Sequence, residues 1–480
     1  MAEPGSTIRW GRLILCAALG AFVAALPTPD GLGPEAWRVF AVFTGVVLAF
    51  ILRPLDMAPA VLIGIIVLAT SGTVELKDLL SSGFGHSTVW LVVAAFLIAD
   101  AVEETGLGRR IALLLLRALG RSILGLAYAI AATELVLAPF IPSNTARGGG
   151  IIAPVVRGLA ETLGSTPRES PRLAGAYLVQ VGSHSNLVTS AMFLTAMAGN
   201  GLVPPAVRDV LGVDFDYGTW LQGSIVPGLA SLLLVPILLR FLEPPQAIDM
   251  AAVRARVAVD LRALGPARRE EKLLAGLLLA LFLIWSAGPA IQSHLRVRLA
   301  DPTTAALIGV VALVFLRIRT WRQVAGSWRA WDAFIWLGGF VALAEALKGT
   351  GFTSWLGARV EALLPGGDVI TSVILIGIVY FATMYLFSQL TAHIAALAAV
   401  FLAVAKNVGS PPLLAAGIIA YFSCLCGATT PWSSGPVIIY FQQGYVSAAR
   451  WMRNGLGVAI VQITLWLTVG MAWWKWLGWW

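Results

Sequence analysis

Long apolar runs recur along the whole chain, and they limit what it can fold into. About eleven of these runs are long enough to cross a hydrocarbon core of about 30 Å. Of the 480 residues, 58% are hydrophobic and only 12% are charged, and the mean hydropathy is +0.83. A water-soluble domain of this size does not have such a composition. The sequence therefore predicts an all-α integral membrane protein that crosses the bilayer many times.

The charged residues lie mainly in short segments between the apolar runs. The formal net charge is +8, and arginine supplies most of the positive charge. Such clustering follows the positive-inside rule, so the basic charge needs no nucleic-acid partner. Arg9 and Arg12 precede the first apolar run, and no cleavable signal peptide is evident. We expect a multi-pass protein of the cell inner (plasma) membrane with its N-terminus in the cytoplasm.

Two polar islands interrupt the apolar stretches 122–156 and 369–405. The first is Ser143-Asn144-Thr145 and the second is Gln389-Leu390-Thr391. Polar groups at membrane depth are costly unless they face a cavity or a partner. Irregular backbone at that depth is tolerated only where it is buried in protein or lines a cavity. Each stretch therefore predicts a re-entrant hairpin with the polar island at its tip.

The two islands belong to a repeated pattern. Thr145 and Thr391 are 246 positions apart. The dipeptide Trp90-Leu91 also recurs 246 positions later, as Trp336-Leu337. The charges that precede this recurring span change sign, because 72–87 carries two acids and one lysine whereas 317–329 carries four arginines. Opposite flanking charge predicts opposite orientation in the membrane. The chain is therefore expected to contain inverted repeats, as many transporters do.

Polar residues also interrupt two further apolar runs, at 182–190 and at 429–436. We expect broken helices at both places, since paired broken helices near the midplane hold the substrate in repeat transporters. Hydroxyl and amide side chains, free backbone N–H groups and helix N-termini together suit a carboxylate. An alternative is that the first island only satisfies a hairpin turn. The candidate substrate-binding residues are Ser143, Asn144, Thr145, Thr189, Ser190, Gln389, Leu390, Thr391, Thr430, Ser433 and Ser434.

A cationic or titratable residue follows each repeated threonine by two positions. These residues are Arg147 and His393. A dianion at the midplane needs compensating charge, and a side chain supplies it permanently. Two alternatives stay open: Arg147 could snorkel to the cytoplasmic interface, and His393 could be a neutral, hydrogen-bonded histidine.

The chain lacks the motifs of an intramembrane enzyme. It has no H-E-x-x-H motif, and a hydrolase built on His184 or Ser185 finds no further support. The three cysteines, Cys16, Cys424 and Cys426, lie in apolar context and are expected to be buried rather than to form disulfides or bind metal. We therefore expect a transporter with no catalytic residue, no cofactor and no metal site.

The expected organisation has five parts. Residues 1–87 form N-terminal scaffold spans, and 88–219 form the first inverted repeat with the hairpin 122–156. Residues 220–332 add scaffold spans and a cytoplasmic linker, 243–272, with the composition of an amphipathic helix. Residues 333–454 form the second inverted repeat with the hairpin 369–405, and 455–480 form a C-terminal span.

The sequence resembles the divalent anion/sodium symporter family. The strings that carry the resemblance are Pro-Ser-Asn-Thr-Ala-Arg-Gly-Gly-Gly (142–150), Thr-Ser-Ala-Met-Phe-Leu-Thr-Ala-Met-Ala-Gly-Asn (189–200) and Leu-Thr-Ala-His-Ile-Ala-Ala-Leu (390–397). It is most similar to the exchanger branch, which holds bacterial citrate, tartrate and succinate antiporters and plastid 2-oxoglutarate/malate translocators. The resemblance implies eleven spans, two opposed re-entrant hairpins, a homodimeric scaffold and an elevator-like transport domain for a dicarboxylate.

The chain departs from the sodium-coupled branch at the second tip. In that branch both tips carry Ser-Asn-Thr, whose oxygens help to hold sodium, whereas this chain has Gln389-Leu390-Thr391. Together with Arg147 and His393, this resembles the exchanger branch, in which fixed positive charge replaces sodium. The expected function is sodium-independent antiport of C4/C5 dicarboxylates such as malate, succinate and 2-oxoglutarate, with citrate and tartrate as further candidates. The alternative is a sodium- or proton-coupled symporter of dicarboxylates or divalent anions with the same fold.

Overall fold

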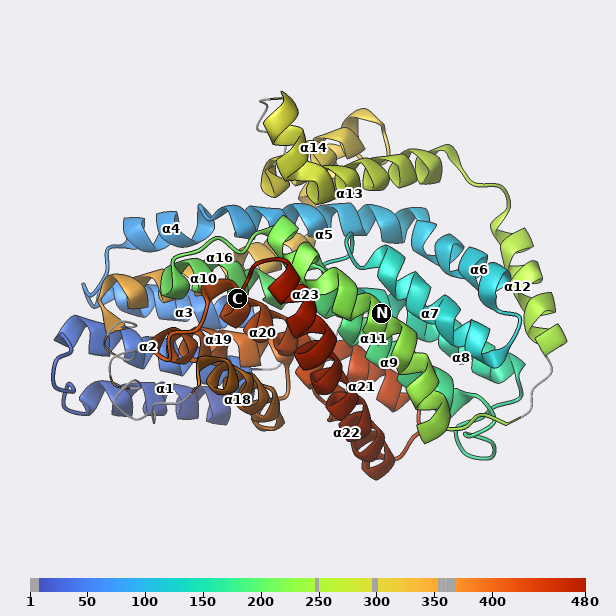
Figure 1. Cartoon of the computed structure of the whole chain (residues 1–480). Coiled ribbons are helices and arrows are strands. Elements are labelled where there is room, and N and C mark those ends of the chain that lie inside the picture. The colour runs from blue at the N-terminus through green and yellow to red at the C-terminus, as the bar shows by residue number, and fades with distance from the viewer. Residues whose placement is uncertain (1–7, 247–249, 296–300, 353–354, 356–358, 360–367) are drawn as a thin grey trace.

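A computed structural model describes residues 8–246, 250–295, 301–352, 355, 359 and 368–480, with the side chains of 287–295 left aside. The described residues form helices and connecting loops, with no β-strand among them (Figure 1). Among the described residues, six helices are long and apolar enough to cross a membrane, or seven if the bent pair Leu76–Phe84 and Ser87–Thr105 counts as one span. The same part of the chain contains five shorter apolar helices of 10–17 residues. The chain is thus an all-α, multi-span protein, and the count of eleven spans stays a prediction.

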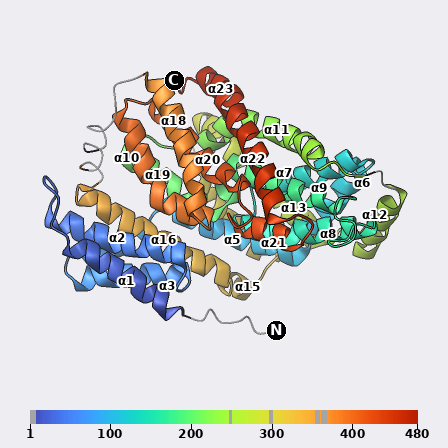
Figure 2. The same cartoon turned by 90° about the horizontal axis from the view of Figure 1, so that it is seen from below.

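The N-terminal helices form a group at one end of the molecule (Figures 1 and 2). They are α1 (Trp10–Ala25), α2 (Pro34–Leu52), α3 (Met57–Thr70) and α4 (Leu76–Phe84). Helices α2, α3 and α4 all pack on α16 (Trp328–Gly349). Gly83 makes the close approach of α4 possible, because a Cβ there would overlap the carbonyl oxygen of Gly338.

The first predicted repeat begins with α5 (Ser87–Thr105), which turns into α6 (Leu107–Leu119) at Gly106, where φ is +74°. The predicted hairpin region that follows contains α7 (Ile123–Leu137), the π-helix η1 (Thr145–Ile152) and α8 (Ala153–Thr162). Next come α9 (Gly175–Met192), the short 3-10 turns η2 (Leu194–Ala196) and η3 (Ala198–Leu202), α10 (Val203–Leu211) and α11 (Tyr217–Leu242).

The middle of the chain connects the two predicted repeats. It contains α12 (Met250–Leu264), α13 (Arg269–Leu295), α14 (Pro302–Phe315) and α15 (Trp321–Ala325). Helix α12 lies within the linker 243–272 that was predicted to be helical. It packs on α6 and α8 at the edge of the molecule (Figures 1 and 2). Val253 and Val257 are its buried residues, whereas its arginines are exposed.

The second predicted repeat begins with α16 and is described again from residue 368. Its elements are α18 (Val369–Ala382), η5 (Thr383–Leu386), α19 (Leu390–Asn407), α20 (Pro412–Leu425), η6 (Cys426–Ala428), α21 (Gly435–Gln442) and α22 (Ala448–Leu465), followed by η7 (Trp466–Gly470) and α23 (Met471–Trp476). Elements of the two halves pack against each other: α10 packs on α19, and α21 packs on η1. The two predicted tips therefore lie against the broken helices of the opposite halves.

The first break lies later in the sequence than predicted. Residues 182–190 belong to the continuous helix α9, and the chain leaves the helix at Phe193, whose backbone is extended (φ −126°, ψ 131°). The position was predicted wrongly because polar side chains can remain inside a continuous helix: Thr189 and Ser190 donate to the carbonyl of Asn186 in their own helix, at 3.1 and 2.7 Å. The last carbonyls of α9 accept hydrogen bonds from Asn200 (2.9 Å, to Ser190), Trp220 (2.8 Å, to Ala191) and Ser224 (2.6 Å, to Met192). The second interruption, at 429–434, is where the sequence predicts it.

Candidate substrate site

Arg147 is the most completely bonded side chain near the first tip, and it is fully buried. Its Nε donates to Glu134 at 2.7 Å, and its Nη1 donates to the carbonyls of Ile141 and Ala196, both at 2.9 Å. Its Nη2 lies 3.1 Å from Ser190 Oγ and 3.4 Å from Thr189 Oγ1. The guanidinium thus joins α7, the loop before η1, α9 and the first break, so Arg147 does not snorkel to the interface.

Glu134 supplies the negative charge beside Arg147. It is fully buried, and both of its carboxylate oxygens accept from Asn186 Nδ2 at 3.1 Å. Buried charges of this kind are tolerated when they are paired and hydrogen-bonded. The sequence analysis missed Glu134, although a signal was present: it is a lone carboxylate within the apolar run 122–156.

The residues of the first tip divide into bonded and unbonded groups. Ser143 Oγ accepts from the backbone N–H of Ala146 at 3.1 Å, which is a turn contact. The backbone carbonyl of Asn144 accepts from Asn186 Nδ2 at 3.2 Å. The buried side-chain Nδ2 of Asn144 has no hydrogen-bond partner within the described chain. Thr145 begins the π-helix η1, a local irregularity that is frequent at functional sites.

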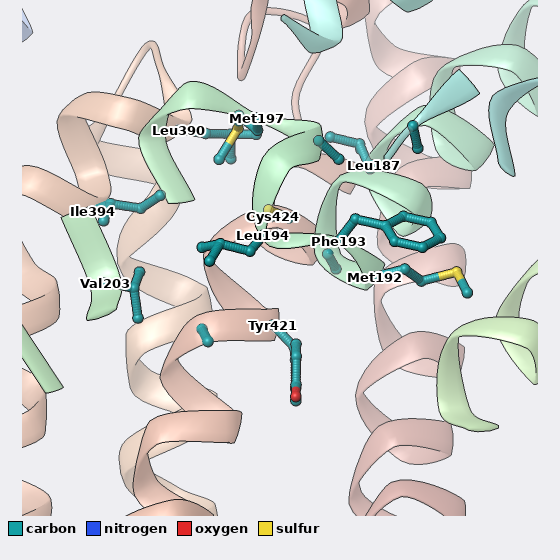
Figure 3. Close-up of a cluster of buried hydrophobic side chains, with 14 of the residues drawn as sticks. Leu187, Met192, Phe193, Leu194, Met197, Val203, Leu390, Ile394, Tyr421 and Cys424 are labelled. Carbon is teal, nitrogen blue, oxygen red and sulfur yellow. The ribbon is translucent and has the colours of Figure 1, made fainter. Parts of the chain in front are cut away.

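The second tip precedes and begins α19. The carbonyl of Gln389 accepts from the backbone N–H of His393 at 3.1 Å. Leu390 is buried, and a Cβ added at Gly427 would lie 3.2 Å from its Cδ2. Thr391 lies against the first break, because a Cβ added at Gly199 would be 2.8 Å from Thr391 Oγ1. Figure 3 shows the apolar side chains at this break, which come from the break itself (Phe193, Leu194 and Met197) and from α9, α10, α19 and α20.

Among the described residues, the second break contributes three buried hydroxyls without a hydrogen-bond partner, those of Thr429, Thr430 and Ser434. Ser433 Oγ donates to the carbonyl of Gly427 at 2.6 Å, so it serves the turn itself. Thr430 and Ser434 are buried, and their hydroxyls lack a hydrogen-bond partner in the part of the chain that is described. Together with Asn144, Thr430 and Ser434 are candidate residues near the tips whose buried polar atoms are free to bind a ligand.

His393 lies in an aromatic environment beside the second tip and is fully buried. Its Nε2 is 2.9 Å from Thr383 Oγ1, and its Nδ1 is 4.0 Å from Cys426 Sγ. The ring packs on Tyr380 with centroids 4.4 Å apart. These contacts, none of which involves a carboxylate in the described residues, suit a neutral imidazole. Arg147 and His393 therefore sit in different hydrogen-bond networks, one beside each tip.

Two solved structures share this arrangement of helices. One is the YdaH transporter of Alcanivorax borkumensis, with a TM-score of 0.58 and 14% identity over 98% of this chain and 97% of that one. The other is MtrF of Neisseria gonorrhoeae, described as an antimetabolite efflux pump, with a TM-score of 0.55 and 13% identity over 98% and 95% of the two chains. The fold is therefore that of a membrane transporter.

Sequence comparison gives the family. The model of the sodium:sulfate symporter transmembrane region matches residues 7–480. YflS of Bacillus subtilis, which is named as a malate transporter, is 39% identical over 477 residues, covering 99% of this chain and 98% of YflS. The L-tartrate/succinate antiporter of Escherichia coli is 34% identical over 492 residues, covering 97% and 98%. The chain belongs to this family of transporters, and the predicted membership in its exchanger branch is confirmed.

Proposed function

We propose that this protein exchanges C4/C5 dicarboxylates across the inner membrane without sodium. The observation that carries the proposal is the buried Glu134–Arg147 pair, in which a fixed guanidinium occupies the place beside the first tip. Two relatives that each cover nearly the whole chain are named as a malate transporter and an L-tartrate/succinate antiporter. The substrate candidates are malate, succinate and 2-oxoglutarate, with citrate and tartrate as further members of the class.

The substrate would lie between the two tips and the two breaks. A carboxylate only accepts hydrogen bonds, so its site needs donors. Asn144 Nδ2 and the hydroxyls of Thr430 and Ser434 are such donors. Helices α19 and α21 both begin without a side-chain cap, so their first N–H groups add further donors. The other proposed contacts are Ser143, Thr145, Thr189, Ser190, Gln389, Leu390, Thr391 and Ser433.

Arg147 would act as a permanent cation in place of a mobile one. It binds two backbone carbonyls and two hydroxyl groups, which are ligands that a sodium ion also accepts. Glu134 balances its charge, so further charge compensation for a dianion would come from helix N-termini and from a proton on His393. The protein would then need no cation gradient to hold the first tip against α9.

The same proposal extends to the transport unit. The packing of α10 on α19 and of α21 on η1 supports an inverted-repeat unit with two opposed re-entrant hairpins. We propose that this unit moves as an elevator against a homodimeric scaffold, with eleven spans and a cytoplasmic N-terminus. No cofactor or metal takes part in this mechanism.

The test is counterflow in proteoliposomes. Vesicles loaded with malate should take up labelled succinate in sodium-free buffer, whereas vesicles loaded with chloride should not. Citrate, tartrate and 2-oxoglutarate, added outside one at a time, should rank the substrates by competition. Uptake into dicarboxylate-free vesicles that follows an imposed sodium or proton gradient would contradict exchange and support the symporter alternative.

A further inference from the structure

A cavity of about 670 Å³ lies between the first hairpin region and the helices α5, α6, α12 and α16. One wall consists of η1 and α8, and the facing walls come from the other four helices. Its polar lining residues are Glu103, Arg109, Arg256, Asp260 and Arg329. The volume exceeds what a four-carbon dicarboxylate needs, so a hydrated anion fits.

Arg109 is the positive charge in this cavity that lacks a counter-ion. Arg256 binds Asp260 at 3.1 Å, and Arg329 binds Glu103 at 2.8 Å. The two acids of the lining are therefore already paired. Arg109 is exposed in the first turn of α6 and has no ion-pair or hydrogen-bond partner among the described residues. The lining residues thus carry three arginines and two carboxylates, and the unpaired charge among them is that of Arg109, since Arg329 also binds Asp100 (2.7 Å) outside the lining.

The opposite wall, which also contains Ile151, Val155 and Leu159, carries a row of smaller residues that reaches the first tip. Ala146, Gly150, Pro154 and Gly158 line it at successive turns. A Cβ added at Gly150 or at Gly158 would meet no atom within 4 Å, so this wall is open to the cavity. Ala146 follows Thr145 directly in the sequence. The cavity thus runs from Arg109 to the residue next to the proposed substrate site.

We propose that this cavity is an anion-collecting vestibule through which dicarboxylate reaches the first tip from the side of the membrane that carries α12, and that Arg109 captures the anion. The inference rests on the proposed function and identifies how its substrate enters. Clefts lined by charge of one sign raise the local concentration of opposite charge and the association rate. Arg109 lies outside the substrate contacts, so it acts on capture and not on the translocation step.

The first experiment removes the unpaired charge. Arg109→Gln should raise the KM for dicarboxylate about threefold to tenfold at low ionic strength, with kcat unchanged. The rise should appear only on the face that carries α12, and it should shrink near 0.5 M salt, where screening is strong. Arg117→Gln is the matched control, because Arg117 is exposed on the same helix but does not line the cavity. Equal effects of the two substitutions would mean that Arg109 acts only through the general charge of the surface, and they would overturn the proposal.

The second experiment probes the cavity without requiring transport. Gly158→Cys should react with a charged methanethiosulfonate, and malate should slow that reaction at least threefold. Arg157→Cys is the control on the same helix, since Arg157 is exposed outside this cavity; its reaction should be insensitive to malate. The three native cysteines are buried, so background labelling should be low.

The two experiments separate this inference from the proposed function. If the wild-type protein fails to exchange dicarboxylates, the proposed function fails, and malate protection of Gly158→Cys still decides whether the cavity binds anions. Protection by anionic phospholipid but not by malate would assign the cavity to a lipid headgroup and overturn the vestibule. Absence of protection by either would do the same.

Discussion

Thr145 packs directly against Gly435, so closely that a Cβ at position 435 would overlap its side chain. The second repeated threonine has the equivalent neighbour, because Thr391 packs against Gly199. In both cases the threonine belongs to one tip, and the glycine belongs to the broken helix of the other half. Each tip therefore contacts the break in the other half of the chain through the same kind of threonine–glycine contact.

Replacing either glycine should separate a tip from its break. Gly435→Ala and Gly199→Ala should each lower dicarboxylate exchange at least tenfold, because the added methyl group displaces Thr145 or Thr391. Gly276→Ala is the control, since a Cβ there meets no atom within 4 Å. Exchange rates in proteoliposomes at equal protein content measure the effect. Wild-type rates in both glycine variants would show that the tips tolerate displacement.

The Glu134–Arg147 pair should behave as a unit. Glu134→Gln leaves the Arg147 charge buried without its counter-ion, which costs about 3–5 kcal/mol. The midpoint temperature of thermal unfolding in detergent should fall sharply for Glu134→Gln and for Arg147→Gln. The double variant should recover part of the loss, because it leaves no unpaired charge. Additive losses in the double variant would mean that the two charges are not coupled.

Exchange should proceed in the absence of sodium. Arg147 already occupies the carbonyl and hydroxyl ligands beside the first tip. Malate/succinate exchange rates should therefore agree within a factor of two between choline and sodium buffers, with loaded counter-substrate in both. An absolute requirement for sodium would remove the fixed-cation interpretation of Arg147.

His393 should give the exchange a pH dependence if it binds a proton together with the substrate. A bound dianion favours the imidazolium, whereas burial favours the neutral ring, so substrate affinity should rise mainly as the pH falls towards about 5, at the acidic end of the range in which histidine usually titrates. A substrate that stays a dianion over this range keeps its own titration out of the measurement. His393→Gln removes the titrating group and should flatten the pH profile. Thr383→Val removes only the hydroxyl partner of the imidazole, so a pH dependence should remain. An unchanged profile in His393→Gln would make His393 a structural residue.

The unbonded polar atoms near the tips should bind the substrate. Asn144→Ala, Thr430→Val and Ser434→Ala should each raise the dicarboxylate KM, since one hydrogen bond contributes about 0.5–3 kcal/mol. Ser433→Ala is a useful contrast, because its hydroxyl already bonds the carbonyl of Gly427. Its effect should therefore appear in thermal stability as well as in transport. Wild-type affinity in the three other variants would place the substrate elsewhere.

The amino-acid sequence alone determined the membrane class, the family, the repeated threonines and the interruption at 429–434. These features can be read locally, because a bilayer makes each polar residue within an apolar run costly and therefore informative. The helical linker and the burial of the three cysteines could be predicted for a similar reason, from the composition of their own segments.

Only the tertiary structure decided which distant groups meet. It gave Arg147 its partner Glu134, moved the first break from 182–190 to 193–202, and seated Thr145 and Thr391 on glycines of the opposite halves. A helix ends where other segments supply donors to its last backbone carbonyls, which have no partner within the helix. Asn200, Trp220 and Ser224 set the end of α9 in this way, and their positions depend on how the whole chain folds.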